Sequence, residues 1–162
     1  MNAEAEFMDA LHGEAERARR EFLTCTLGLE SYGIDILQVQ EIRKIEHVTR
    51  IPHVARFVRG VINLRGAIVP VVDLGIMFGF PQPLALQDAS AIVLNVDGRL
   101  VGLAVSSVSD VLALAEDEIL PAPDLGERAV GAAISGIGVQ DGVSVLLLDV
   151  AHLMRRVREE RE

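Results

Sequence analysis

Residues 60–74 read GVINLRGAIVPVVDL, and residues 136–150 read GIGVQDGVSVLLLDV. The two segments align without a gap, 76 residues apart. Each contains an apolar run, a turn at a glycine, and a second apolar run that ends in aspartate. Asp73 and Asp149 then precede a helix-like tail, where a carboxylate can cap the first helical N–H groups. This internal repeat predicts two copies of one small structural unit.

A weaker match aligns residues 32–42 with residues 101–111, at an offset of 69. Asp97-Gly98 and Asp141-Gly142 separate pairs of apolar runs, and Arg65-Gly66 occupies the corresponding place in the first copy. Asp-Gly is a strong hairpin signal, because glycine accepts the positive φ of primed turns. A fourth turn is expected at residues 30–33. Because the apolar residues are mostly Val, Ile, Leu and Ala, the hairpins should be short β-strands.

Two hairpins and one further strand give about five strands in each half, and closing a small sheet removes its exposed edges. The sequence therefore predicts an all-β (mainly β) fold of two five-stranded barrels with short helices. The first barrel should cover about residues 21–80 and the second about 88–149, joined near the prolines of residues 79–84. A C-terminal helix is expected over about 150–161, and residues 1–20 as a helical or disordered extension. Each half is small, so their interface should be apolar.

The composition excludes several classes of protein. No apolar run approaches the roughly 18 residues of a membrane span, and the first 20 residues lack the apolar core of a secretory signal. Cys25 is the single cysteine, which excludes an internal disulfide and fits a reducing compartment. A cytoplasmic protein without membrane insertion is expected.

Charge is unevenly distributed in a chain whose net charge is −9. Residues 43–65 hold six basic side chains and one acid, whereas residues 73–127 hold nine acids and one arginine. The runs are either solvated faces or two faces of opposite potential that orient protein partners. The net charge argues against a nucleic-acid binder. A nucleic-acid role for the basic run would show as salt-dependent DNA binding.

Residues with catalytic or ligating chemistry do not form a recognisable site. His12, His47, His53 and His152 lack the spacing of metal ligands. Cys25 has no basic neighbour to lower its pKa, so an inert buried thiol is expected. No nucleophile elbow or phosphate-binding loop is present. We therefore expect no enzyme activity, no metal and no cofactor.

Three segments, read together, resemble a known family. Residues 32–42 read YGIDILQVQEI, and residues 57–66 read FVRGVINLRG, followed by IVPVVDL at 68–74. Residues 105–111 read VSSVSDV, followed by ILPAP at 119–123. In this order and spacing, the segments resemble the CheW family of chemotaxis coupling proteins from about Glu21 to Met154. The segment before Glu21 and the loop Gly126–Gly131 depart from the family pattern.

The resemblance implies a fold of two five-stranded, SH3-like barrels. It also implies a non-catalytic adaptor that couples chemoreceptors to the histidine kinase CheA. The partners would be the cytoplasmic tip of a chemoreceptor and a CheA-type regulatory domain. The adaptor would be monomeric in isolation, and recruited to receptor arrays at the inner face of the membrane.

The same resemblance implies a receptor-binding site. Arg65 matches the arginine implicated in receptor coupling, and Val39 and Glu41 match positions in a groove between the barrels. Ile42 and Asn63 are their neighbours. The expected mechanism places apolar receptor side chains on Val39 and Ile42, with Arg65 pairing with a receptor carboxylate. The kinase-facing surface is not tied to individual residues.

Two alternative functions are open, and the sequence does not separate the first of them from chemotaxis. The same adaptor could serve a receptor–kinase pathway unrelated to motility, which a deletion phenotype would distinguish. A small-ligand β-barrel would need a roomy pocket with convergent polar groups. Five-stranded barrels are normally filled by their own side chains, which argues against that function.

Overall fold

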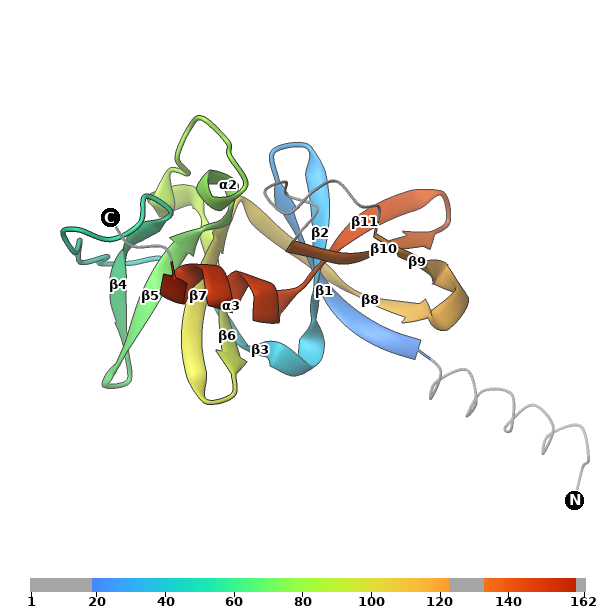
Figure 1. The fold of residues 1–162 in the computed structure, drawn as a ribbon, viewed down its shortest axis with the longest axis horizontal. Helices are drawn as coiled ribbons and strands as arrows, with labels where there is room; N and C mark the ends of the chain where they lie inside the picture. Colours follow the sequence, from blue (N-terminus) through green and yellow to red (C-terminus); the bar gives the residue numbers. More distant parts are fainter. Residues whose placement is uncertain (1–18, 123–132, 160–162) are drawn as a thin grey trace, which may run out of the picture.

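The computed structural model describes residues 19–122 and 133–159, which form two β-sheets with short helices (Figure 1). One sheet has five strands in the order β3–β6–β7–β5–β4. The other has six strands in the order β8–β1–β2–β11–β10–β9. The predicted mainly β fold with two sheets is confirmed. The five strands expected in each half are correct for one sheet, and β9 is an additional strand in the other.

The elements follow one another closely along the chain. The five-stranded sheet consists of β3 (Val39–Lys44), β4 (Val58–Leu64), β5 (Ala67–Asp73), β6 (Ser90–Val96) and β7 (Arg99–Val105). The six-stranded sheet consists of β1 (Arg19–Leu27), β2 (Glu30–Asp35), β8 (Ser107–Ala115), β9 (Ile119–Pro121), β10 (Ile134–Gln140) and β11 (Val143–Leu148). The helices are α2 (Leu74–Met77) and α3 (Val150–Glu159), with 3₁₀ turns η1 (Ile36–Gln38), η2 (Leu86–Asp88) and η3 (Glu116–Glu118).

The repeat seen in the sequence is also a repeat in the structure. The hairpin β4–β5 leads into α2, and the hairpin β10–β11 leads into α3. The backbone N–H of Asp73 donates to the carbonyl of Phe57, and that of Asp149 donates to the carbonyl of Ala133, both at 2.7 Å. Each aspartate also caps its helix, as predicted, by accepting from the backbone N–H three residues later.

Each copy of the repeat contributes its first hairpin to the sheet of the other copy. The early hairpin β1–β2 lies in the six-stranded sheet, because β2 pairs in parallel with β11. The later hairpin β6–β7 lies in the five-stranded sheet, because β7 pairs in parallel with β5. The sheets therefore do not follow the expected division into residues 21–80 and 88–149. The reason is local: only η1 separates β2 from β3, and only Ser106 separates β7 from β8, so each short link carries the chain into the other sheet.

The largest buried cluster lies between the two sheets rather than inside either one. It combines Leu23 and Ile34 of the six-stranded sheet with Ile92 and Leu103 of the five-stranded sheet. Smaller clusters fill each sheet's own interior. The expected apolar interface between the halves is thus present. Burial of this kind contributes roughly 25 cal/mol per Å² of apolar surface removed from water.

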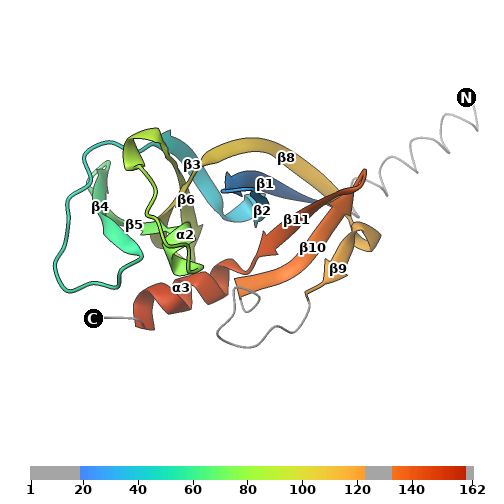
Figure 2. The same cartoon turned by 90° about the horizontal axis from the view of Figure 1, so that it is seen from above.

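The α3 helix connects the two halves at the edge of this interface. It follows β11 and runs across to the five-stranded sheet, which is plain from above (Figure 2). Leu153 and Met154 on its apolar face are buried. Arg156 is half-buried, donates to the carbonyl of Met77 at 3.3 Å and lies over the Phe57 ring. The helix begins at Val150, where the sequence predicts, and its described part ends at Glu159.

Tight turns join the hairpins. The central residues of the β4–β5, β6–β7 and β10–β11 turns all have positive φ: Arg65 and Gly66, Asp97 and Gly98, Asp141 and Gly142. These three predicted turns are confirmed. The fourth turn, predicted at residues 30–33, is wrong. Glu30 already pairs with Leu27, so the β1–β2 hairpin turns earlier, at Gly28, whose φ is +59°. Strand β1 also begins at Arg19, two residues inside the segment expected to be an extension.

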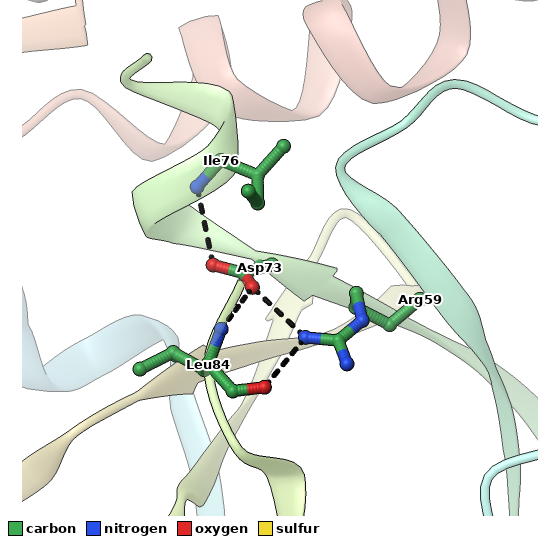
Figure 3. Close-up of polar contacts among 4 residues, drawn as sticks. All are labelled: Arg59, Asp73, Ile76 and Leu84. Carbon is green, nitrogen blue, oxygen red and sulfur yellow. Dashed lines mark hydrogen bonds and ion pairs between the residues drawn. The ribbon is translucent and has the colours of Figure 1, made fainter. Parts of the chain in front are cut away.

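A buried carboxylate holds α2 and the following loop against the five-stranded sheet. Asp73 is fully buried and accepts from the backbone N–H groups of Ile76 at 3.1 Å and Leu84 at 3.0 Å. The Nη1 atom of Arg59 donates to Asp73 at 3.0 Å and to the Leu84 carbonyl at 2.8 Å (Figure 3). Breaking such a pair by removing one partner is costly, because it leaves an uncompensated charge.

Among the described residues, no helix has the length and apolar character needed to cross a membrane.

Candidate protein-binding site

A β-bulge in β3 decides how the candidate residues are oriented. The pairing of β3 with β6 shifts between Val39 and Glu41, so Gln40 is an extra residue in the strand. Its side-chain oxygen accepts from the Asn95 amide at 3.2 Å. Val39 lies opposite Leu94, Glu41 opposite Val93 and Ile42 opposite Ile92.

The bulge places the apolar and charged candidates on opposite faces of β3. Directly opposed residues of a ladder share a face. Leu94 and Ile92 belong to the cluster between the sheets, so Val39 and Ile42 point to that side, and Val39 packs against the cluster. Val93 belongs to the interior of the five-stranded sheet, which places Glu41 on the other face. In a regular strand Val39 and Glu41 would have shared a face.

Glu41 and Arg65 form a hydrogen-bonded ion pair within the protein. The pair links β3, at one edge of the five-stranded sheet, to the β4–β5 turn at the other edge. The hydrogen bond from Arg65 lowers the pKa of the Glu41 carboxyl, and the charges of Arg65 and Arg43 add to the effect. The same hydrogen bond raises the pKa of Arg65. Arg65 is still two-thirds exposed, at 66%, so a partner can reach it.

The turn that carries Arg65 is fixed by Asn63. Its side-chain oxygen accepts from the Gly66 backbone N–H at 2.9 Å, which holds Arg65 in its positive-φ conformation. Asn63 is exposed, but in this structure its side chain supports the turn. Because Asn63 pairs across the ladder with Ile68, that isoleucine shares its outward face and is 64% exposed.

The structure therefore brings together two small groups from the five predicted residues. Glu41, Arg65 and Asn63 gather around the β4–β5 turn, and Val39 and Ile42 line the side toward the six-stranded sheet. Sequence reasoning missed the exposed apolar side chains Leu37, at 90%, and Ile68. A signal for Ile68 existed, since it alternates with buried Val69 in a strand whose partner position is the polar Asn63.

The described residues offer little chemistry for catalysis. Cys25 is fully buried, and burial raises the pKa of its thiol to about 12, so it stays protonated and unreactive in the folded state. Within residues 19–122 and 133–159, no three His, Cys, Asp or Glu side chains gather as metal ligands do. The groups exposed at the candidate site are suited to contact with another macromolecule.

Comparison with known proteins identifies the family. The family of CheW-like domains matches residues 21–158. This chain belongs to the CheW family. The match begins at the residue where the sequence resemblance began, and it includes all five candidate residues together with both copies of the internal repeat.

Relatives in the CheW family extend over nearly the same length. The chemotaxis protein CheW of Klebsiella aerogenes is 42% identical over 139 residues, which cover 86% of this chain and 84% of the relative. The chemotaxis protein CheW of Rhizobium meliloti is 33% identical over 143 residues, covering 88% and 91%. The crystal structure of the scaffolding protein TtCheW from Thermoanaerobacter tengcongensis matches with a TM-score of 0.74 and 32% identity, covering 80% of this chain and 88% of that one.

Proposed function

We propose that this protein is a non-catalytic adaptor that couples chemoreceptors to a CheA-type histidine kinase at receptor arrays on the inner face of the membrane. Membership of the CheW family and the similarity to a protein described as a scaffold support an adaptor role. The relatives' designation as chemotaxis proteins favours chemotaxis over a pathway unrelated to motility. The adaptor acts by occupying both partners and fixing their geometry, without group transfer.

The observation that carries the receptor-binding part of the proposal is the exposed guanidinium of Arg65, which Glu41 holds at the edge strand β3, while the opposite face of that strand carries an exposed apolar side chain. Ile42 is 47% exposed on the side of β3 that faces the six-stranded sheet. Apolar side chains of a receptor helix would pack on Ile42 and on the exposed part of Val39. Arginine is one of the residue types enriched among those that dominate binding energies.

Arg65 would reach a receptor carboxylate only by sharing or leaving its internal partner. Glu41 already accepts its hydrogen bond. The receptor therefore competes with Glu41, and the internal pair holds the guanidinium in place before binding. A pre-oriented side chain loses less conformational entropy on association. Glu41 thus acts as a positioning residue in the proposal, and Arg65 as the contact.

A charge swap separates these two roles. In Arg65→Glu, we expect receptor-tip binding to fall by roughly 30-fold, the size of effect found at residues that dominate an interface. Adding Glu41→Arg restores an internal ion pair with reversed polarity. We expect the double variant to recover its thermal midpoint but not its affinity, because a receptor carboxylate would now meet a glutamate. Binding is measured by calorimetric titration with a receptor fragment.

Arg99→Glu is the matched control, since Arg99 also stands beside a tight hairpin turn and is exposed. It should bind the receptor fragment as the unchanged protein does. Undiminished receptor binding by folded Arg65→Glu, or full recovery of affinity in the double variant, would remove Arg65 from the receptor contact.

The adaptor role itself requires both partners to bind at once. We expect the protein to be monomeric alone, and to form a ternary complex with the receptor fragment and a CheA-type regulatory domain. Size-exclusion chromatography with light scattering measures both properties. If the kinase domain displaced the receptor fragment, the coupling proposal would fail even though each pairwise interaction existed.

A further inference from the structure

A basic depression lies on the five-stranded half, apart from the candidate protein-binding site. It has a volume of about 390 Å³ and is open to solvent. Its polar lining comes from Arg50, His53, Arg56 and Arg59. The remaining lining is largely apolar and includes Ile51, Val54, Val58, Ile76 and Pro83. No carboxylate is among the lining residues, although the whole chain carries a net charge of −9.

Hydrogen bonds fix the backbone around this depression at two points, next to Arg50 and next to Arg56, and the Arg59 side chain is fixed by its own contacts. Thr49 and Val61 exchange backbone hydrogen bonds of 2.9 and 2.8 Å, which fix the segment that continues into Arg50. Phe57 is buried and accepts from the Asp73 N–H, which fixes the residue after Arg56.

Arg59 is the third fixed cation. Its contacts with Asp73 and the Leu84 carbonyl both use Nη1, as Figure 3 shows. The rest of its guanidinium has no other partner among the described residues, and its side chain is 25% exposed along the depression. The ion pair with Asp73 neutralises much of its charge but leaves donors that a bound anion can use.

Arg50 and Arg56 are exposed, and neither pairs with a carboxylate in the part of the chain that the structure describes. The unpaired guanidinium groups of Arg50 and Arg56 therefore share one depression with the guanidinium of Arg59, which uses only Nη1 in its contacts with Asp73 and Leu84. Planar guanidinium forks suit bidentate contact with phosphate oxygens, and a phosphate monoester carries close to two negative charges at neutral pH. The charge of the free arginines matches such a dianion.

The lining is mainly polar, but it also contains a smaller apolar part, which a bare inorganic ion would leave uncovered. The volume lies within the range of about 300–1,000 Å³ that is usual for small-molecule sites. We propose that this depression is a binding site for a phosphate monoester carried on an apolar or aromatic body. Arg50 and Arg56 bind the phosphate, Arg59 orients it, and the ring or chain packs on Ile51 and Val58.

The test uses the full chain and two simple probes, phenyl phosphate and inorganic phosphate. Each is titrated while amide resonances are followed by NMR, with phenol as the uncharged control. We expect phenyl phosphate to shift the amides of residues 50–59 and Ile76, and to bind at least roughly fivefold more tightly than inorganic phosphate, because its ring covers apolar lining. Phenol should cause no saturable shift over the same concentrations.

The variants Arg50→Gln and Arg56→Gln should each weaken phenyl phosphate binding about tenfold, since each removes a charge-assisted contact. Arg19→Gln, which removes an exposed charge from the six-stranded sheet, is the matched control and should bind normally. The thermal midpoint of each variant, measured without ligand, shows that the fold is intact. A ligand-induced rise of the midpoint in the unchanged protein gives a second measure of binding.

Several results would overturn the proposal. These are no saturable shift with phenyl phosphate up to roughly 10 mM, shifts that map outside residues 50–59 and Ile76, or unweakened binding in both arginine variants. A short DNA duplex that binds through these arginines while phenyl phosphate does not would also overturn it. The site would then bind the phosphodiester backbone of DNA, and its affinity would fall steeply with salt concentration.

Discussion

At the scale of single residues, Asp73 and Asp149 offer a comparison within one molecule. Both cap a helix at the same place of the repeat. The Asp149 carboxylate makes only its capping contact with His152 among the described residues, whereas that of Asp73 also binds Arg59 and the Leu84 N–H. Chemically identical residues at equivalent positions therefore differ in burial and in charge pairing.

We predict that Asp73→Ala lowers the free energy of unfolding by about 3 kcal/mol or more, because it leaves Arg59 unpaired and two N–H groups without an acceptor. Asp149→Ala should cost only about 1 kcal/mol, the usual effect of losing a cap. Urea unfolding followed by circular dichroism measures both. Equal losses would mean that the ion pair adds nothing to the cap.

The Glu41–Arg65 pair predicts a pH dependence with a definite sign. The pKa of Glu41 is lowered on folding, so its contribution to stability is complete above the ordinary carboxylate pKa. The contribution is lost as the pH falls through the lowered pKa of the folded state. We expect the protein to be more stable than Glu41→Gln at pH 7, and the difference to shrink below about pH 4.

Denaturation midpoints of the two proteins between neutral and acid pH test this prediction, with Glu46→Gln as the control on an exposed glutamate. A carboxyl NMR titration of Glu41 should give a lowered pKa that returns toward normal in Arg65→Gln. A pH-independent difference between the two proteins would contradict the assignment.

Sequence could locate Glu41 and Arg65 but not their pairing. They are separated by 24 residues, and they meet only because the two edges of the five-stranded sheet approach each other. The grouping of Val39 with Ile42 depends on the bulge at Gln40, which the apolar pattern does not indicate. Arg59 and Asp73, by contrast, are neighbours because β4 and β5 pair as a hairpin, with Val58 opposite Val72. What the sequence does not indicate is the loop that returns at Leu84 to contact both of them.

At the scale of elements, β4 needs a glycine at residue 60, because the backbone of Thr49 packs against the strand at that point. Gly60 has a φ of +144°, and a Cβ there would lie 2.3 Å from the Thr49 carbonyl oxygen. A side chain would therefore push apart the Thr49–Val61 pairing that holds Arg50. Gly66, in the β4–β5 turn, has a φ of +88°, but a Cβ there would meet nothing within 4 Å, so it provides a control for strain alone.

We predict that Gly60→Ala costs roughly 3 kcal/mol or more, from strain and collision together. Gly66→Ala should cost about 1 kcal/mol, from strain alone. Thermal and urea unfolding measure both variants. Gly60→Ala should also reduce phenyl phosphate binding, while Gly66→Ala should not. A cost at Gly60 no larger than at Gly66 would show that the Thr49 segment moves away freely.

Sequence predicted most elements because hairpin turns are local. Asp97-Gly98 and Asp141-Gly142 specify a conformation through their own backbone preferences. The first hairpin was misplaced because Gly28 competed with Gly33 for the turn. Gly33 instead lies in β2 close to Leu147, a contact that involves a residue more than 100 positions away.

At the scale of the whole molecule, the repeat was visible in the sequence but the exchange of hairpins was not. Hairpins β1–β2 and β6–β7 are equivalent, so either could in principle pair with either copy of the second unit. The links at η1 and Ser106 are short and lead directly into the other sheet, which the residue pattern alone does not indicate. The sequence therefore predicted the two repeated units and the apolar interface between them, but not that each early hairpin pairs with the strands of the other unit.

The exchange predicts that a cut at residues 79–84 does not give two independent domains. We expect a protein cleaved at an inserted protease site between Pro81 and Pro83 to remain one complex on size-exclusion chromatography. Separated fragment 1–81 should be unfolded by NMR, because β3 has lost its partner β6 and β5 has lost β7.

Cys25 provides a probe for this prediction, since it is buried in the cluster between the sheets. It should resist thiol reagents in the intact and the cleaved complex and react rapidly in the separated fragment. Two folded pieces that elute independently, each with a protected core, would contradict the exchanged arrangement.

In the sequence, the strands of the five-stranded sheet all lie between the first two and the last four strands of the six-stranded sheet, and this order has a consequence for synthesis on the ribosome. The strands of the five-stranded sheet occupy one continuous segment, 39–105, whereas the six-stranded sheet draws on both ends of the chain. The inner sheet can acquire all its strands while translation continues. The hairpin β1–β2 emerges first yet waits for β8, β10 and β11. Its apolar face stays without its final neighbours for most of elongation, so this hairpin is the segment most exposed to nascent-chain chaperones and to premature aggregation.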